Sequence, residues 1–92
     1  MVDKDLTNDL TIRDVLKELE KTRISLLSTI NKIRTGTDDD KLKFVNKCEC
    51  LVDVYTAVKP TNHKDLRVQE NAIECLNKAI DFVKIDNPEL FS

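Results

Sequence analysis

The sequence predicts an all-α fold, an antiparallel up-down-up bundle of three helices that associates into an oligomer. Its 92 residues include one glycine and two prolines, too few breaks for a β fold, which needs a turn about every 8–12 residues. Along three segments, apolar residues recur at alternating spacings of three and four, a pattern that lines one face of a helix. A chain of this length suits one domain and buries only roughly 60–65% of its unfolded surface, so association would add needed burial.

The first helix is expected at about residues 11–35, after a flexible segment of residues 1–10. Thr11 is a good N-cap, and Asp14 suits the positive end of the helix dipole. Gly36 is the residue type that commonly ends a helix in left-handed backbone. The apolar seam of this helix consists of Ile12, Leu16, Leu19, Leu26, Ile30 and Ile33.

The second helix is expected at about residues 39–59. Thr37 supplies an N-cap, the aspartates at 38–40 supply negative charge, and Pro60 stops the helix because proline disfavours helical geometry in the residue before it. Its apolar seam consists of Phe44, Cys48, Leu51, Tyr55 and Val58.

The third helix is expected at about residues 62–85, capped by Thr61 or Asn62 and followed by a tail over residues 86–92 that contains Pro88. Its apolar seam consists of Leu66, Ile73, Leu76, Ile80 and Val83. Because both connections are short, successive helices are expected to run antiparallel, and residues 11–85 form the domain. Nearly complete burial is expected for Ile30, Leu51, Leu76 and Ile80.

Two polar residues interrupt the apolar seams. Arg23 lies between Leu19 and Leu26, and Gln69 lies between Leu66 and Ile73. Two interpretations stay open for both: the side chain reaches out to solvent along an apolar stem, or it has a specific buried partner that fixes the register.

The second helix carries more apolar surface than a three-helix bundle uses. Each residue advances about 100° around a helix, so Cys50, Val54 and Ala57 lie well away from the seam, bordered by Lys43 and Lys47. Contiguous surplus apolar surface marks association sites. These five residues are therefore the predicted interface, and the predicted assembly is a homodimer.

The residues that enzymes use are not arranged for catalysis. The single histidine, His63, lies in a turn, where histidines are usually solvated or capping. No carboxylate is expected at a core position, where burial would raise its pKa. The acidic residues that fall on polar helix faces include Glu18, Glu20, Glu49, Asp53, Glu70 and Glu74. With one glycine there is no phosphate-binding loop. We therefore expect no enzymatic activity and no cofactor.

The three cysteines do not form a metal-ligand pattern. Cys48 and Cys50 are two residues apart, so on a helix their thiols point about 200° apart and cannot easily share an ion. Adding Cys75 and His63 gives four ligands, but not at the spacings of zinc modules. No metal and no internal disulfide are expected, and free thiols favour a cytoplasmic location. The first ten residues contain no apolar run of the kind a secretory signal needs.

The charge pattern argues against nucleic acid and membranes as partners. The 15 basic and 17 acidic residues are interspersed and give a net charge of −2. Two small basic stripes are flanked by acidic residues, which favours a solvated surface over a nucleic-acid site. No stretch approaches the roughly 18 apolar residues of a transmembrane helix. The stripes consist of Lys41, Lys43 and Lys47, and of Arg13, Lys17 and Lys21.

The stretch from Asp65-Leu66-Arg67 through Ile73-Glu74 to Ala79 and Ile80 follows a short turn and an antiparallel helix. In this it resembles the helical hairpin of small phage proteins that sequester the cyclic nucleotide signals of bacterial immunity. The resemblance covers about a third of the chain. The chain departs from that pattern in its full-length N-terminal helix and in having no aromatic residue ahead of the hairpin.

Two functions follow as hypotheses. The first is a non-catalytic protein-interaction module, a small regulator or inhibitor that acts through a helical face, binding itself and possibly another protein, with Leu90 and Phe91 as an apolar tail. The second, implied by the resemblance, is an anti-defence protein of the host cytoplasm that holds a cyclic nucleotide between protomers. Tyr55 would then stack on the base and Arg23 would hold phosphate.

Overall fold

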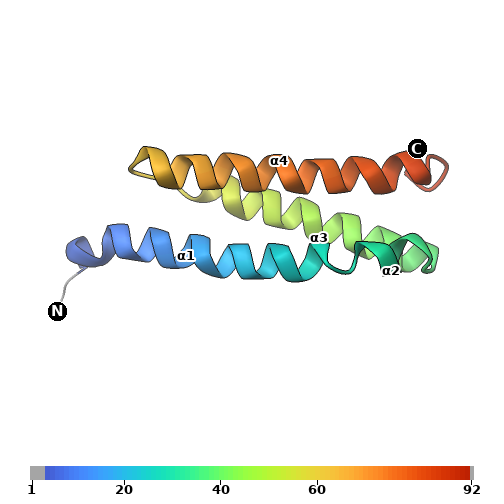
Figure 1. Cartoon of the computed structure of the whole chain (residues 1–92), viewed down its shortest axis with the longest axis horizontal. Helices are drawn as coiled ribbons and strands as arrows, with labels where there is room; N and C mark the ends of the chain where they lie inside the picture. The colour runs from blue at the N-terminus through green and yellow to red at the C-terminus, as the bar shows by residue number, and fades with distance from the viewer. Residues whose placement is uncertain (1–3, 92) are drawn as a thin grey trace.

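The structure is a computed structural model that describes residues 4–91, with side chains described from residue 12 onward. The described part consists of helices joined by short turns, without a strand (Figure 1), in the order α1 (Lys4–Leu27), α2 (Ile30–Arg34), α3 (Asp38–Ala57) and α4 (His63–Asp86). The predicted all-α class is confirmed. Part of the predicted flexible segment, residues 1–3, lies outside the described residues.

The first helix differs from the prediction at its start and in its middle. It begins at Lys4 instead of Thr11, and the pair Leu6 and Leu10, four residues apart, is the sequence signal that could have extended it. It is interrupted at Ser28 and Thr29, where the two hydroxyls donate to the carbonyls of Ser25 and Leu26, both at 2.7 Å. Such local hydrogen bonds compete with the helical ladder.

Side-chain caps fix where α3 and α4 begin. Thr37 Oγ1 accepts from the Asp40 amide at 3.1 Å, and Asp40 Oδ2 accepts from the Thr37 amide at 3.2 Å, which is a capping box. Asn62, one of the two predicted caps, accepts from the Asp65 amide at 2.9 Å. These reciprocal bonds satisfy amides that have no partner within the helix.

Gly36 is required by the close approach of the capping box and not by a left-handed turn. Its backbone is not in the left-handed region that the sequence predicted, and a Cβ added there would lie 2.8 Å from Asp40 Oδ2 and 3.2 Å from the carbonyl oxygen of Lys32. Glycine is therefore needed here because a side chain would collide with the cap of the next helix.

The core lies mainly between α3 and α4, which share the most extensive contact in the molecule. Leu76 and Ile80 are buried, as predicted, whereas Ile30 and Leu51 are only partly buried and the prediction for them was wrong. Ile30 follows the interruption and belongs to a short helix with no buried residue. The buried apolar residues are Leu16, Phe44, Val45, Cys48, Tyr55, Ala72, Leu76, Ala79, Ile80 and Val83.

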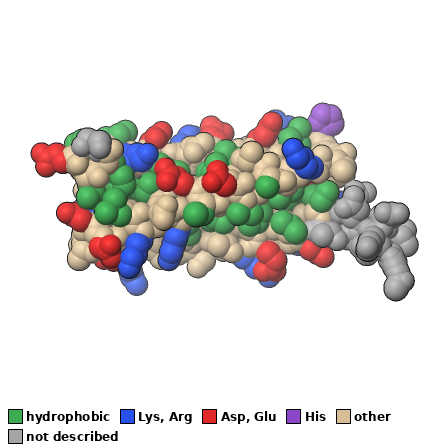
Figure 2. All heavy atoms as spheres, turned by 180° about the vertical axis from the view of Figure 1, so that it is seen from behind, with side chains coloured by type: hydrophobic (Ala, Val, Ile, Leu, Met, Phe, Trp, Pro, Cys, Tyr) green, Lys and Arg blue, Asp and Glu red, His purple; other side chains and the backbone are tan. Residues whose placement is uncertain are grey.

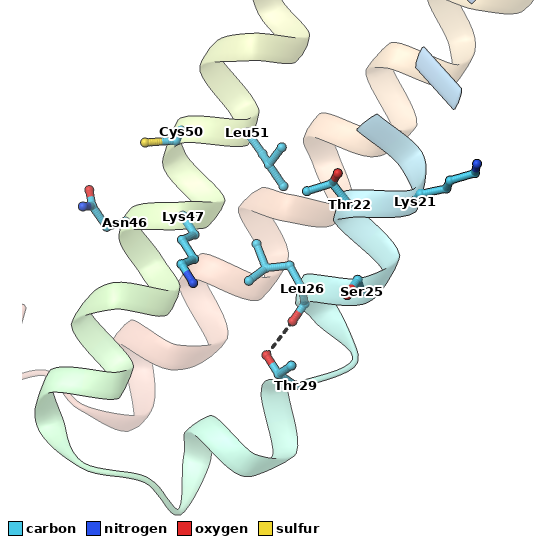
Figure 3. Close-up of a pocket in the computed structure, with 9 residues that line it drawn as sticks. All are labelled: Lys21, Thr22, Ser25, Leu26, Thr29, Asn46, Lys47, Cys50 and Leu51. Atoms are coloured by element: carbon cyan, nitrogen blue, oxygen red, sulfur yellow. Dashed lines mark hydrogen bonds between the residues drawn. The ribbon is translucent and has the colours of Figure 1, made fainter. Parts of the chain in front are cut away.

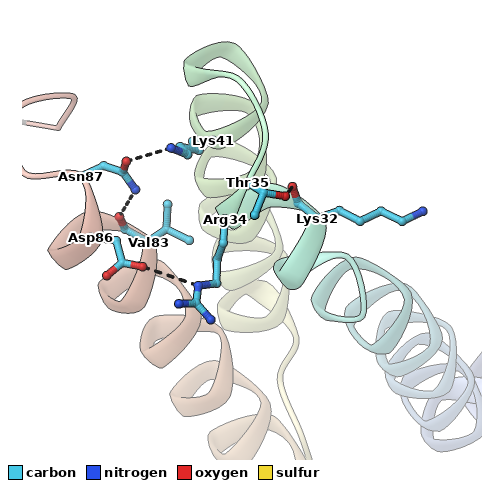
Figure 4. Close-up of polar contacts among 7 residues, drawn as sticks. All are labelled: Lys32, Arg34, Thr35, Lys41, Val83, Asp86 and Asn87. Atoms are coloured by element: carbon cyan, nitrogen blue, oxygen red, sulfur yellow. Dashed lines mark hydrogen bonds and ion pairs between the residues drawn. The ribbon is translucent and has the colours of Figure 1, made fainter.

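Polar contacts join α2 and the start of α3 to the end of α4 (Figure 4). Arg34 Nε lies 3.7 Å from Asp86 Oδ2, and the Arg34 guanidinium lies 5.0 Å from the centroid of the Phe82 ring. Lys41 Nζ donates to Asn87 Oδ1 at 3.0 Å, and Asn87 Nδ2 donates to the Val83 carbonyl at 2.9 Å. The start of α3 and the end of α4 are therefore held together.

The C-terminal tail folds back onto the bundle. Phe91 packs against the core, and Lys84 Nζ lies 6.0 Å from the centroid of its ring. Part of the apolar tail that the sequence offered to a partner therefore packs against the protein's own core.

The molecule is a rod, 51 Å long and about 20 Å across. Its radius of gyration is 15.5 Å, whereas a compact globule of this length would have about 12 Å. The rod shape leaves long helix flanks on the surface. None of the helices in the described part of the chain combines the length and the apolar character that crossing a membrane requires.

Candidate interaction surface

The outward side of α3 carries the five residues that the sequence predicted as an interface. Cys50, Val54 and Ala57 are all exposed, and Val54 keeps 45% of its surface accessible to solvent. Lys43 and Lys47 are exposed beside them. The seam on the other side of α3 packs inward, where α3 contacts α1, α2 and α4, and it leaves these residues exposed. We call the set Lys43, Asn46, Lys47, Cys50, Asp53, Val54 and Ala57 the α3 face.

A groove of about 730 Å³ runs between α1 and α3 beside the α3 face. Figure 3 shows Leu26 of α1 and Leu51 of α3 pointing toward each other across it, while Cys50 points away from it. Leu51 is partly buried because it lies in this groove and not at the centre of the core. The groove is lined by Lys21, Thr22, Ser25, Leu26, Thr29, Asn46, Lys47, Cys50 and Leu51.

The surface around α3 combines apolar and charged side chains. Figure 2 shows hydrophobic side chains in a row along the middle of the face seen from behind, with lysine, arginine and acidic side chains at its margins. Lys43 Nζ lies 3.1 Å from Asp39 Oδ2, an exposed pair one helical turn apart. Lys47 and Asp53 form no ion pair with any described side chain. Of the three charged residues of the α3 face, Lys47 and Asp53 are therefore available to a partner.

The two residues predicted to bind a nucleotide do lie together, but inside the bundle. Tyr55 is fully buried, so its ring has no open face on which a base could stack, and the predicted stacking role does not fit this structure. Arg23 Nη1 donates to Cys75 Sγ at 3.6 Å, and Nη2 lies 3.8 Å from Glu20 Oε2. Arg23 therefore has specific partners on α1 and α4.

This cluster is incompletely paired. Arg23 Nε and the Tyr55 hydroxyl are buried and form no hydrogen bond with a described residue. Burial raises the pKa of Tyr55, and the nearby Arg23 guanidinium partly offsets that rise. A buried polar group without a partner costs free energy, so these two unpaired atoms reduce the net stability that the contacts of Arg23 contribute.

Gln69 also has specific partners inside the bundle. Of the two interpretations that the sequence allowed, a side chain reaching solvent or one with a buried partner, the second therefore applies to Gln69. Its Nε2 donates to the carbonyls of Tyr55 at 2.5 Å and of Val58 at 2.8 Å, at the C-terminal end of α3. Asp65, one turn earlier, is 8% exposed and accepts from Asn62 Nδ2 at 3.1 Å. The expectation that no carboxylate would be buried was therefore wrong, because the cap of α4 lies against the bundle.

The thiols occupy three different environments. Cys48 is buried, Cys75 is partly buried and Cys50 is exposed, and all three are free. Burial, with smaller contributions from Glu49 and Cys75, raises the pKa of Cys48 to about 11. Among the described side chains, no three histidine, cysteine or acidic residues are grouped so as to hold a metal ion. Exposed His63 is the first residue of α4.

Other exposed apolar residues escaped the sequence analysis. Ile24 on α1 and Ile85 on α4 are 56% and 76% exposed. Ile85 lies outside the apolar seam of its helix, and Ile24 follows Arg23 on the outer side of α1, so the seam pattern alone could have identified both.

Comparison with protein-family models, with curated proteins and with solved structures gives no match for this chain.

Proposed function

We propose that this protein is a non-catalytic interaction module, an up-down-up helical bundle that self-associates through the α3 face and so acts as a small regulator or inhibitor. The observation that supports this most directly is the exposure of Cys50, Val54 and Ala57 beside a groove with an apolar floor. A second copy covering that surface would remove apolar area from water, worth roughly 25 cal/mol per Å² before association costs.

The rod shape supports the same proposal. A small domain drawn out to 51 Å has a high ratio of surface to core, so burial between copies contributes more than it would for a globule. Cyclic symmetry with two copies is the commonest arrangement of soluble oligomers, and it uses the same surface on both. The three free thiols fit a reducing cytoplasm, which we include in the proposal.

Sedimentation equilibrium of the wild type and of Val54→Glu tests the proposal. We expect a wild-type dimer and a folded Val54→Glu monomer, because a buried unpaired carboxylate opposes association. Val68→Glu is the matched control, since Val68 is a similarly exposed valine, at 39%, on α4. A monomeric wild type at about 1 mM, far above the micromolar constants of small interfaces, would contradict self-association.

Thermal melting with cyclic nucleotides separates this proposal from the nucleotide-binding alternative. A ligand at about 100 times its dissociation constant stabilises the folded state by roughly 2.7 kcal/mol. We expect no such shift, because Tyr55 is buried. A shift that Arg23→Gln abolishes would favour the alternative.

A further inference from the structure

We propose that the partner on the α3 face is an antiparallel α3 of a second copy, with the twofold axis beside Cys50. In this arrangement Lys47 of each protomer forms an ion pair with the partner's Asp53. The proposal rests on the proposed function and adds to it the orientation, the register and the charge pairs of the interface.

The α3 face is symmetric about Cys50. Lys47 and Asp53 lie three residues to either side, and Lys43 and Ala57 lie seven residues to either side. Three residues correspond to about 4.5 Å along the helix axis. An antiparallel pair centred on Cys50 therefore brings each Lys47 level with the partner's Asp53. A parallel pair would instead bring lysine level with lysine and aspartate level with aspartate, which repel.

The positions around the helix also permit the ion pair. Lys47 and Asp53 lie about 60° to either side of Cys50. For two helices about 9 Å apart, the Cβ atoms of Lys47 and the partner's Asp53 would be roughly 8 Å apart. A lysine side chain spans most of that distance, and its aliphatic stem would lie on the partner's Val54.

Two features of the single protomer agree with this arrangement. Lys47 and Asp53 form no ion pair with a described side chain, whereas Lys43 is paired with Asp39. Cys50 and Ala57, along the centre of the face, are small, so two helices can approach closely there. An interface made by one pair of helices buries an area at the low end of the range of stable interfaces, so we expect a dissociation constant of micromolar order.

Exchanging the charges tests the orientation. Sedimentation equilibrium should show Lys47→Asp and Asp53→Lys each weakening the dimer roughly tenfold, because each change places like charges together at two symmetric sites. The double exchange should return the dissociation constant to within about threefold of the wild type, since opposite charges then meet again. The control is Asp81→Lys, an exposed aspartate on α4, which should change the constant by less than about threefold. A double variant as weak as the two single changes combined would overturn the pairing.

Thiol oxidation tests the register. Facing Cα atoms at the axis would be about 4–5 Å apart, within disulfide range. Copper-catalysed dioxygen, which takes two electrons and two protons from each pair of thiols, should join Cys50 to the partner's Cys50. In Cys50→Ser with Val54→Cys, the introduced thiols lie about 12 Å apart along the axis and should not join.

The outcomes separate the two proposals. A monomeric wild type contradicts the proposed function. A wild-type dimer that bridges through the thiol introduced at position 54, and not through Cys50, overturns the antiparallel register alone.

Discussion

Replacing Gln69 with methionine should lower the free energy of unfolding by about 1.5–3 kcal/mol. Gln69 donates to two carbonyls at the end of α3, and its side chain is buried between α3 and α4. Methionine keeps a similar length and volume but cannot donate. The change therefore removes both hydrogen bonds while leaving the packing nearly intact.

The magnitude follows from what each carbonyl retains. The Tyr55 carbonyl also accepts from the Val58 amide at 3.1 Å, so it keeps one bond, and the loss of the other costs about 0.5–1.5 kcal/mol. The Val58 carbonyl loses the Gln69 donor, at a cost of about 1–3 kcal/mol if nothing replaces it. Val58 is only partly buried, so water can reach its carbonyl and the lower part of that range applies.

Urea unfolding followed by circular dichroism, at one fixed protein concentration, measures this loss. A loss of 2 kcal/mol corresponds to a melting temperature lower by roughly 8–16 °C in a domain of this size. Glu70→Met is the control, because Glu70 is the exposed neighbour and the two residues have similar helix propensity. A change below about 0.5 kcal/mol for Gln69→Met would refute the reasoning, since neither bond would then contribute to stability.

Three further predictions concern the core, the buried cluster and the thiols. Leu76→Ala should lower the free energy of unfolding, measured with urea, by about 2–5 kcal/mol, because Leu76 is fully buried. A loss below about 0.5 kcal/mol would place Leu76 outside the core. Arg23→Met should leave the melting temperature unchanged or raise it, because Arg23 is incompletely paired and burying a charge is costly. A clear decrease would show that the contacts of Arg23 are net stabilising. With a thiol reagent at pH 8, mass spectrometry should find Cys50 modified first when the protein is monomeric, because Cys50 is exposed. Cys48 should be modified last, because it is buried and its pKa is raised to about 11, which leaves little of the reactive thiolate. Early modification of Cys48 would contradict its burial.

Helix boundaries marked by side-chain chemistry were predictable from the sequence. Thr37 and Asn62 cap the helices that the sequence assigned to them, because capping depends on neighbours within three residues. The interruption at Ser28 and Thr29 was not predicted, since neither glycine nor proline marks it. The interruption depends on the two hydroxyl groups donating to nearby backbone carbonyls. Serine and threonine form such bonds in some helices and not in others, so the sequence alone does not reveal them.

The candidate surface was predictable where it depends on one helix alone. The exposure of Cys50, Val54 and Ala57 follows from helical periodicity within α3. The placement of Leu51 and Tyr55 was not predictable, because it depends on how closely α1 packs against α3. Leu51 faces the groove between these helices, while Tyr55 is enclosed by three helices, and a seam pattern does not distinguish the two positions.

The close pairing of α3 with α4 has a consequence for the order of folding. These helices are adjacent in sequence, are joined by a short capped connection, and share the most extensive contact. By contrast, the bond from Arg23 to Cys75 joins residues 52 positions apart. Contacts between near neighbours close with less loss of chain entropy, so the hairpin from Asp38 to Asp86 should form in the folding transition state and α1 should dock afterwards. Mutations in the α3–α4 core should then mainly slow folding, and truncating Leu16 should mainly speed unfolding.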